Sequence, residues 1–147
     1  MMFSSENIKE ILIPTDGSET SVRAAEYGIG IAKAHNAQVT VIYVVDEVVV
    51  DQFSKVTERE TIEHELKTNG ASYTHYITNL AKKEDVKVNT MIVKGRPFEQ
   101  IVNLAKGLNV DLIVMGTCGR RCSERILIGS VAERVIEYSK CPVLVVK

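Results

Sequence analysis

Four residues late in the chain have the types and spacing of a phosphate-binding loop. Gly116 and Gly119 follow an apolar run, and nine further residues separate Gly119 from Gly129 and Ser130. Glycine lacks a Cβ and tolerates positive φ, so an anion can approach the backbone N–H groups beside it. Ser130 would add a hydroxyl, and the positive end of a helix beginning there favours an anion. The spacing indicates phosphate binding, although the same residues could simply turn the chain and cap a helix.

An acidic residue near the start of the chain could complete such a site. Asp16 comes shortly after an apolar run that stops at Pro14. Its carboxylate could accept hydrogen bonds from ribose hydroxyls or hold Mg²⁺. Because Glu19 follows three residues later, Asp16 could instead be the N-cap of a helix and serve that helix alone. Further positive charge is available from Arg120, Arg121 and Arg125, which follow Gly119.

The chain has three cysteines, Cys118, Cys122 and Cys141. An odd number without a secretion signal favours free thiols over a disulfide framework. Cys118 and Cys122 are spaced suitably for a metal, but no second pair of Cys or His residues completes a tetrahedral set. We therefore expect reduced thiols, with a redox or metal sensor in this loop as the alternative.

Short apolar runs, rich in β-branched residues, predict five buried strands at residues 8–14, 39–45, 86–93, 111–115 and 142–146. Helical patterns separate them: one begins near Asp16 or Ser18 and reaches His35, and others run from Glu58 to about Glu84, from Pro97 to about Leu108, and onward from Ser130. Residues 48–57 show no clear period, and their pattern indicates a loop of undefined shape. Strands that alternate with helices predict right-handed βαβ units and a parallel sheet.

These elements predict a single α/β domain over residues 1–147, with a doubly wound five-stranded parallel sheet in the order 3-2-1-4-5 and helices on both faces. Ligands of such sheets bind beyond the carboxyl ends of the strands, where the strand order reverses. The first and fourth strands would bring Asp16 and Gly116 there. The last strand begins at Pro142 and ends at Val146, and its apolar edge predicts a homodimer.

The composition excludes several classes of partner. The 147 residues include 18 basic and 19 acidic side chains, which gives a net charge of −1 and no long-range attraction to nucleic acid or to an acidic membrane. No stretch approaches the ~20 apolar residues that a membrane span needs. We expect a cytoplasmic protein with neither a nucleic-acid nor a membrane partner.

Several motifs together resemble those of the universal stress protein family, over nearly the whole chain. They lie at residues 14–19, 44–46, 93–97 and 142–146, and the glycines with Ser130 match the spacing of the family's ATP-binding branch. The resemblance implies ATP with Mg²⁺ as ligands. It implies that Gly116, Gly119, Gly129 and Ser130 hold ribose and phosphates, that Asp16 lies by the ribose and metal, that Pro14 and Thr15 line the pocket, and that the Val44 backbone meets adenine; Met115, Arg120 and Val131 complete the expected nucleotide-binding set.

The leading interpretation is a nucleotide-binding regulator of the stress response, whose loops a protein partner of unknown identity could read. The alternative is a slow ATP hydrolase or phosphotransferase. Such an enzyme needs a group that positions water or an acceptor, and no histidine stands near the glycines in sequence. Asp16 as the sole acid is better suited to hold a metal, so we expect no catalytic residues.

Overall fold

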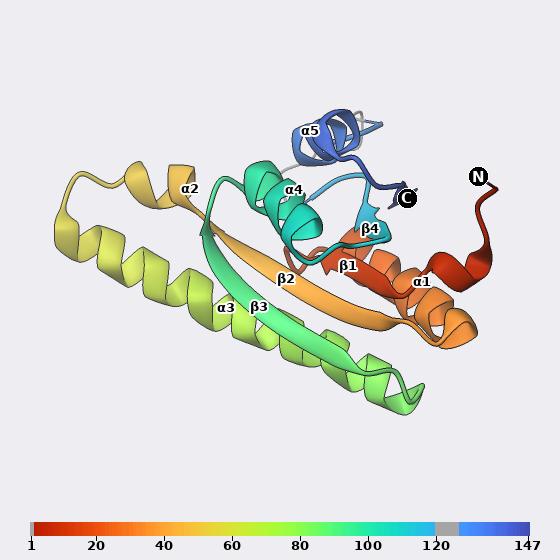
Figure 1. Cartoon of the computed structure of the whole chain (residues 1–147). Helices are drawn as coiled ribbons and strands as arrows, with labels where there is room; N and C mark the ends of the chain where they lie inside the picture. The colour runs from red at the N-terminus through yellow and green to blue at the C-terminus, as the bar shows by residue number, and fades with distance from the viewer. Residues whose placement is uncertain (1, 120–126) are drawn as a thin grey trace.

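A parallel sheet forms the centre of the molecule in the computed structural model, which describes residues 2–119 and 127–147 (Figure 1). The strands of the described residues are β1 (Glu10–Pro14), β2 (Gln38–Asp46), β3 (Val88–Gly95), β4 (Leu112–Gly116) and β5 (Val143–Val146). Their order is β3-β2-β1-β4-β5, and every neighbouring pair is parallel. The predicted fold class and strand order are confirmed.

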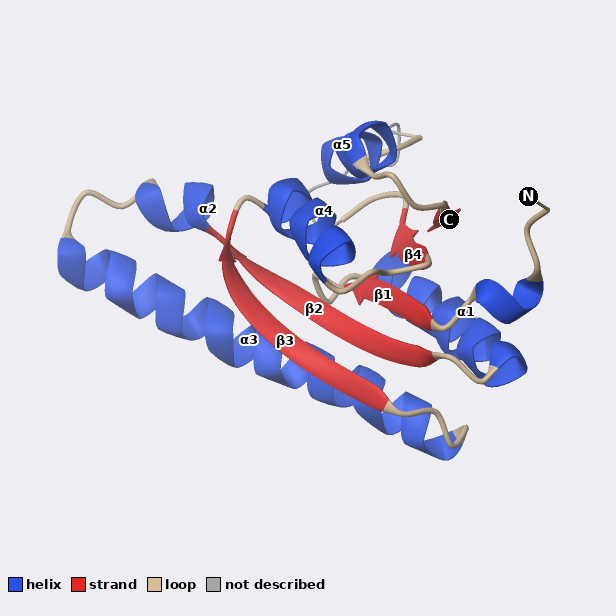
Figure 2. Cartoon of the chain, viewed as in Figure 1, coloured by secondary structure: helices blue, strands red, loops and turns tan. Residues whose placement is uncertain are grey.

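Helices cover both faces of the sheet (Figure 2). They are α1 (Glu19–His35), α2 (Glu47–Asp51), α3 (Val56–Lys83), α4 (Pro97–Gly107) and α5 (Ser130–Tyr138), preceded by a 3-10 turn at Ser5–Asn7. On one face, Ile29 of α1 and Ile77 of α3 pack with Ile11 and Val39 of the sheet. On the other face, α4 and α5 cover Leu12 and Ile42 through a second apolar cluster.

Local sequence explains where α1 begins and ends. Ser18 is the N-cap, and its side chain accepts a hydrogen bond from the N–H of Ser21 at 3.2 Å. The helix ends at Asn36, which adopts the left-handed conformation with φ of 53°. Asparagine tolerates that conformation better than most residues and is a common helix stop.

The segment between β2 and the long helix differs from the prediction. The loop predicted for residues 48–57 is partly wrong, because Glu47–Asp51 form the short helix α2 and α3 already begins at Val56. Asp46 caps α2 by accepting a hydrogen bond from the N–H of Val48 at 3.0 Å. Five residues are too few to display a helical period, and three of them are valines, which lower helix propensity.

The buried residues of α3 are Gly70, Thr74, Ile77 and Ala81, all in its second half. The first half is held by partly buried Ile62 and Leu66, which pack with Tyr43, Val45 and Val50. We call this third group of apolar side chains, together with Tyr73, the tyrosine cluster. Within the part of the chain that the structure describes, no helix is long and apolar enough to cross a bilayer.

Candidate functional site

The strand order reverses at β1, which lies between β2 and β4. The ladder between β1 and β4 covers only Ile11 with Leu112 and Leu12 with Ile113, so the last residues of these two strands are not paired with each other. The ladder between β1 and β2, in contrast, continues to Pro14. We call the ends of β1 and β4, with residues 15–18 and 117–119 that follow them, the switch point. Ligands of doubly wound sheets bind at this place.

The loop after β1 is fixed by its own hydrogen bonds. Thr15 is buried, its N–H donates to the Ile42 carbonyl at 2.9 Å, and its hydroxyl accepts from the N–H of Gly17 at 3.2 Å. The Asp16 carboxylate accepts from the N–H of Ser18 at 2.9 Å through Oδ1. Ser18, not Asp16, is therefore the N-cap of α1, although Asp16 does stabilise the turn that leads into the helix.

The Asp16 carboxylate lies directly against Gly119. A Cβ placed on Gly119 would overlap Oδ2 of Asp16 and lie 3.5 Å from Asp16 Cγ. Residues that stand far apart in the sequence thus meet at the carboxyl edge of the sheet. Only a residue without a side chain fits beside the carboxylate in this arrangement.

Gly116 has a different neighbour. A Cβ on Gly116 would lie 3.0 Å from the carbonyl carbon of Thr20 and 3.2 Å from the nitrogen of Ser21, so this glycine lets the first turn of α1 pack on the end of β4. The Thr20 hydroxyl then donates to the Cys118 carbonyl at 2.5 Å. These contacts join α1 to the loop after β4.

The beginning of α5 is tied to the same loop. Gly129 is its N-cap, and the Gly129 N–H donates to the Thr117 carbonyl at 2.6 Å, while the Thr117 N–H donates to Val146 at 2.9 Å. The Gly129 amide is therefore occupied. The N–H groups of Ser130, Val131 and Ala132 lie in the first turn of α5, where the helix itself provides no acceptor for them. Among the described residues, none of these three N–H groups donates a hydrogen bond. Ser130 is exposed.

The remaining predicted site residues around the switch point differ in how far they are buried. Pro14 and Met115 are buried, the latter in the apolar cluster beneath α4 and α5. Val44 is half-buried on β2, two residues beyond the position that pairs with Pro14, and Val131 is half-buried on α5. Arg120, with Arg121, Cys122 and Arg125, lies outside the described residues.

The expectation of free thiols is wrong for Cys118, which is disulfide-bonded, and correct for Cys141. The reasoning from compartment and cysteine count gave no information about local geometry, which decides whether two thiols can join. In the described parts of the chain, no group of three His, Cys, Asp or Glu side chains is placed to hold a metal.

Sequence reasoning missed Thr20 and Tyr73. Thr20 is the second residue of α1 and follows the predicted N-cap Ser18 by two positions, so its closeness to the switch point could have been inferred from the sequence. Tyr73 belongs to α3, and a Cβ on Gly17 would overlap its ring. No sequence pattern predicts the contact between Tyr73 and Gly17, because it depends on how the long helix α3 crosses the sheet.

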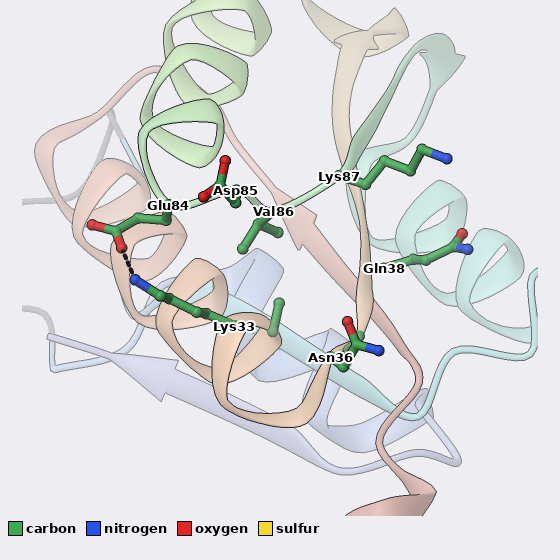
Figure 3. Close-up of a pocket in the computed structure, with 9 residues that line it drawn as sticks. Lys33, Asn36, Gln38, Glu84, Asp85, Val86 and Lys87 are labelled. Carbon is green, nitrogen blue, oxygen red and sulfur yellow. Dashed lines mark hydrogen bonds and ion pairs between the residues drawn. The ribbon is translucent and has the colours of Figure 1, made fainter.

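Two cavities lie away from the switch point. One, of about 410 Å³, opens at the amino edge of the sheet between the ends of α1 and α3, where Lys33 and Glu84 form an ion pair of 2.6 Å (Figure 3). This pairing raises the pKa of the Lys33 ammonium and lowers the pKa of the Glu84 carboxyl. The other cavity, of about 340 Å³, lies between α3 and β3 and includes Thr74 and Ile92. Neither contains a predicted site residue.

The chain is an α/β protein with a doubly wound sheet, and a carboxylate, a close glycine and a helix N-terminus lie at its switch point. The universal stress protein family model matches residues 7–147, and the chain belongs to this family.

Relatives agree with this assignment. Universal stress protein MJ0531 of Methanocaldococcus jannaschii is 45% identical over 145 residues, which cover 98% of this chain and 85% of that protein. The solved structure of MJ0577 from the same organism is 35% identical with a TM-score of 0.85, and the match covers 95% of this chain and 96% of that one. A universal stress protein crystallised in complex with cAMP is 26% identical with a TM-score of 0.73, covering 95% and 97% of the two chains.

Proposed function

We propose that this protein binds an adenine nucleotide, ATP together with Mg²⁺, at the switch point and acts as a regulatory protein of the stress response. The observation that carries the proposal is the meeting of Asp16 and Gly119 beside the end of β4, to which the first turn of α5 is tied. The relative that was crystallised with cAMP supports an adenine nucleotide as the ligand class.

Each element would contribute a different group to the ligand. The exposed Ser130 hydroxyl and the first-turn N–H groups of α5 suit phosphate oxygens, because they combine donors with the positive end of the helix. Gly116 lets α1 pack on the end of β4, and Gly119 leaves room for the Asp16 carboxylate beside that end. The Val44 backbone would meet adenine, with Pro14, Thr15, Met115 and Val131 supporting the walls and Arg120 adding charge.

The Asp16 carboxylate would accept from the ribose or hold Mg²⁺. Mg²⁺ is commonly bound in proteins by one or two carboxylates together with substrate phosphates and water. A single carboxylate at the switch point fits that pattern, since the phosphates themselves would complete the donor set. The ion would neutralise phosphate charge there.

Calorimetric titration with Mg-ATP tests the proposal. The purified chain, stripped of carried-over ligand, is expected to give saturable heat, and Gly119→Val is expected to abolish it because the added side chain overlaps Asp16. Gly107→Ala is the matched control, since a Cβ there meets nothing within 4 Å. Absence of saturable heat in the parent, or equal binding by Gly119→Val, refutes the proposal. Steady phosphate release that Asp16→Ala abolishes without loss of binding would instead identify a hydrolase.

We also propose that the chain forms a homodimer through β5. This strand is four residues long, lies at the edge of the sheet, and presents Leu144 with 36% exposure. Sedimentation equilibrium should show a dimer for the parent and a monomer for Leu144→Lys. Ile92→Lys on the opposite edge strand, at a side chain that is 38% exposed, should leave the dimer intact. A monomeric parent excludes this assembly.

A further inference from the structure

The long helix α3 contacts the loop that carries Asp16 through the aromatic ring of Tyr73. A Cβ on Gly17 would overlap three carbons of the Tyr73 ring, which are the nearest atoms to that position. Gly17 also has φ of +82°, a conformation that L side chains rarely adopt. Both the backbone conformation and the space therefore require a glycine at this point of the loop.

The Tyr73 ring is in turn supported by a second aromatic ring. It packs against Tyr43 of β2 with ring centroids 5.9 Å apart and an interplanar angle of 55°. Tyr43 is 7% exposed, and a Cβ on Gly70 of α3 would overlap its ring. Two tyrosine rings thus form a continuous contact from the body of α3 through β2 to the loop after β1.

This contact bears on the direction of the Asp16 carboxylate. Gly17 follows Asp16, its N–H is bonded to the Thr15 hydroxyl at 3.2 Å, and the next N–H, of Ser18, is bonded to Asp16 Oδ1 at 2.9 Å. The turn is therefore held by Thr15 on one side and by the Tyr73 ring on the other. The remaining carboxylate oxygen, Oδ2, is the one that faces Gly119.

We infer that Tyr73 is a positioning residue for Asp16. Through Tyr73, the position of α3 affects how tightly the switch point binds nucleotide. The inference rests on the proposed function for its consequence, and on the packing of Tyr73 against Gly17 for its cause. Figure 1 shows α3 running beneath β2 and β3, with its beginning joined to α2. Tyr73 lies in the second half of α3, next to the buried Thr74, so its ring is carried by the part of the helix that packs on the sheet.

Tyr73→Leu tests the inference by removing the ring while keeping an apolar side chain. We expect the dissociation constant for Mg-ATP to rise about tenfold in Tyr73→Leu, and to rise less in Tyr73→Phe, which keeps the ring. Leu66→Ala is the matched control. Leu66 belongs to the same tyrosine cluster but lies seven residues, or about 10 Å, along α3 from Tyr73, so it loosens the cluster without uncovering Gly17.

A second measurement does not depend on nucleotide binding. Hydrogen exchange of the Ser18 amide, which is bonded to Asp16, should accelerate at least tenfold in ligand-free Tyr73→Leu, while core amides of β1 exchange as in the parent. Leu66→Ala should leave the Ser18 amide unchanged. A purely structural role for Tyr73 would accelerate the core and the loop alike.

The outcomes separate the two proposals. If the parent binds Mg-ATP and Tyr73→Leu binds equally well, or Leu66→Ala weakens binding as much, the positioning role is refuted and the proposed function stands. If the parent binds no nucleotide, the proposed function fails, and the Ser18 exchange rate alone decides whether Tyr73 fixes the Asp16 turn. An unchanged rate in Tyr73→Leu refutes the inference in either case.

Discussion

Glycines at four positions have different structural roles, although the sequence alone does not distinguish them. Gly119 makes room for a carboxylate, Gly116 for the first turn of α1, and Gly17 for a tyrosine ring. Gly30 meets nothing within 4 Å. The function of a glycine is therefore set by what stands opposite its missing side chain, and substitution separates the cases.

Gly17→Ala should destabilise the fold for two reasons, overlap with Tyr73 and a positive φ. A left-handed conformation costs a non-glycine residue about 1 kcal/mol. In a Tyr73→Ala background the overlap disappears, so the same substitution should cost only that amount. Urea denaturation of the four proteins in this double-mutant cycle measures the difference. Additive effects on the free energy of unfolding would show that the Tyr73 ring is not in close contact with Gly17 in solution.

The elements themselves were largely predictable, because a parallel sheet buries its strands on both faces. Runs such as Ile11 to Ile13 then stand out as continuous apolar segments, and βαβ connectivity leaves few arrangements. The five strands and the helix boundaries at Ser18 and Pro97 follow from such local rules. The short helix α2 does not follow from local rules, because its valines favour a strand or a loop. Its formation depends on the packing of Val50 against α3.

The candidate site was predictable to a lesser degree. Topology alone brings the ends of β1 and β4 together, so the closeness of Asp16 to the late glycines followed from the fold. The sequence left open whether Asp16 or Ser18 caps α1, since both residues are good N-caps and only the backbone path decides. Tyr73 and the disulfide of Cys118 depend on tertiary geometry, which no local pattern records.

Helix α1 offers a direct test of how packing overrides propensity. Gly30→Ala should stabilise the protein by about 1 kcal/mol, because alanine is the better helix former and the added methyl meets open space. Gly28→Ala, two residues earlier, should destabilise it, since its Cβ would lie 2.5 Å from Cδ1 of Ile13. Thermal or urea unfolding should show opposite signs. Equal shifts would mean that α1 does not pack on β1 in this register.

The ion pair between Lys33 and Glu84 links the ends of α1 and α3 and should make stability depend on pH. Lys33 lowers the pKa of Glu84 from 4.5, so the pair contributes above that value and is lost as the pH falls through the folded-state pKa. Glu84 raises the pKa of Lys33 from 10.5, so the contribution is lost at the alkaline side only above that value. Lys33→Met should melt slightly below the parent at pH 7, and the difference should shrink as the pH falls below 4.5.

Salt provides the control for this pair. Both side chains are well exposed, so 1 M NaCl should shrink the difference in melting temperature at pH 7. A difference that survives both acid and salt would come from the aliphatic part of Lys33 and not from its charge.

At the scale of the whole molecule, one sheet separates two apolar cores. Residues of α1 and α3 build one, residues of α4 and α5 the other, and β1 contributes alternately to both through Ile11, Leu12 and Ile13. The switch point touches α1 directly, α5 through Thr117, and α3 through Tyr73. A ligand there would therefore stabilise both layers together.

Mg-ATP at one hundred times its dissociation constant should stabilise the protein by about 2.7 kcal/mol, which corresponds to a rise in melting temperature of about 5–10 °C for a chain of this size. Differential scanning fluorimetry measures the shift. Gly119→Val should show none, because its side chain overlaps Asp16. A shift of equal size with Mg²⁺ alone would assign the stabilisation to the metal and not to the nucleotide.

The position of β1 in the sheet also has a consequence for synthesis. Ile11 pairs with Leu112, and the layer that covers Leu12 and Ile42 comes from α4 and α5. While the ribosome is still translating the final third, a nascent chain can pair β1 with β2 but leaves that side of the sheet open to other polypeptides. Transiently uncovered apolar surface of this kind invites aggregation or capture by chaperones. Synthesis of α4 and α5, rather than of the first half of the chain, therefore determines when this face of the sheet is covered.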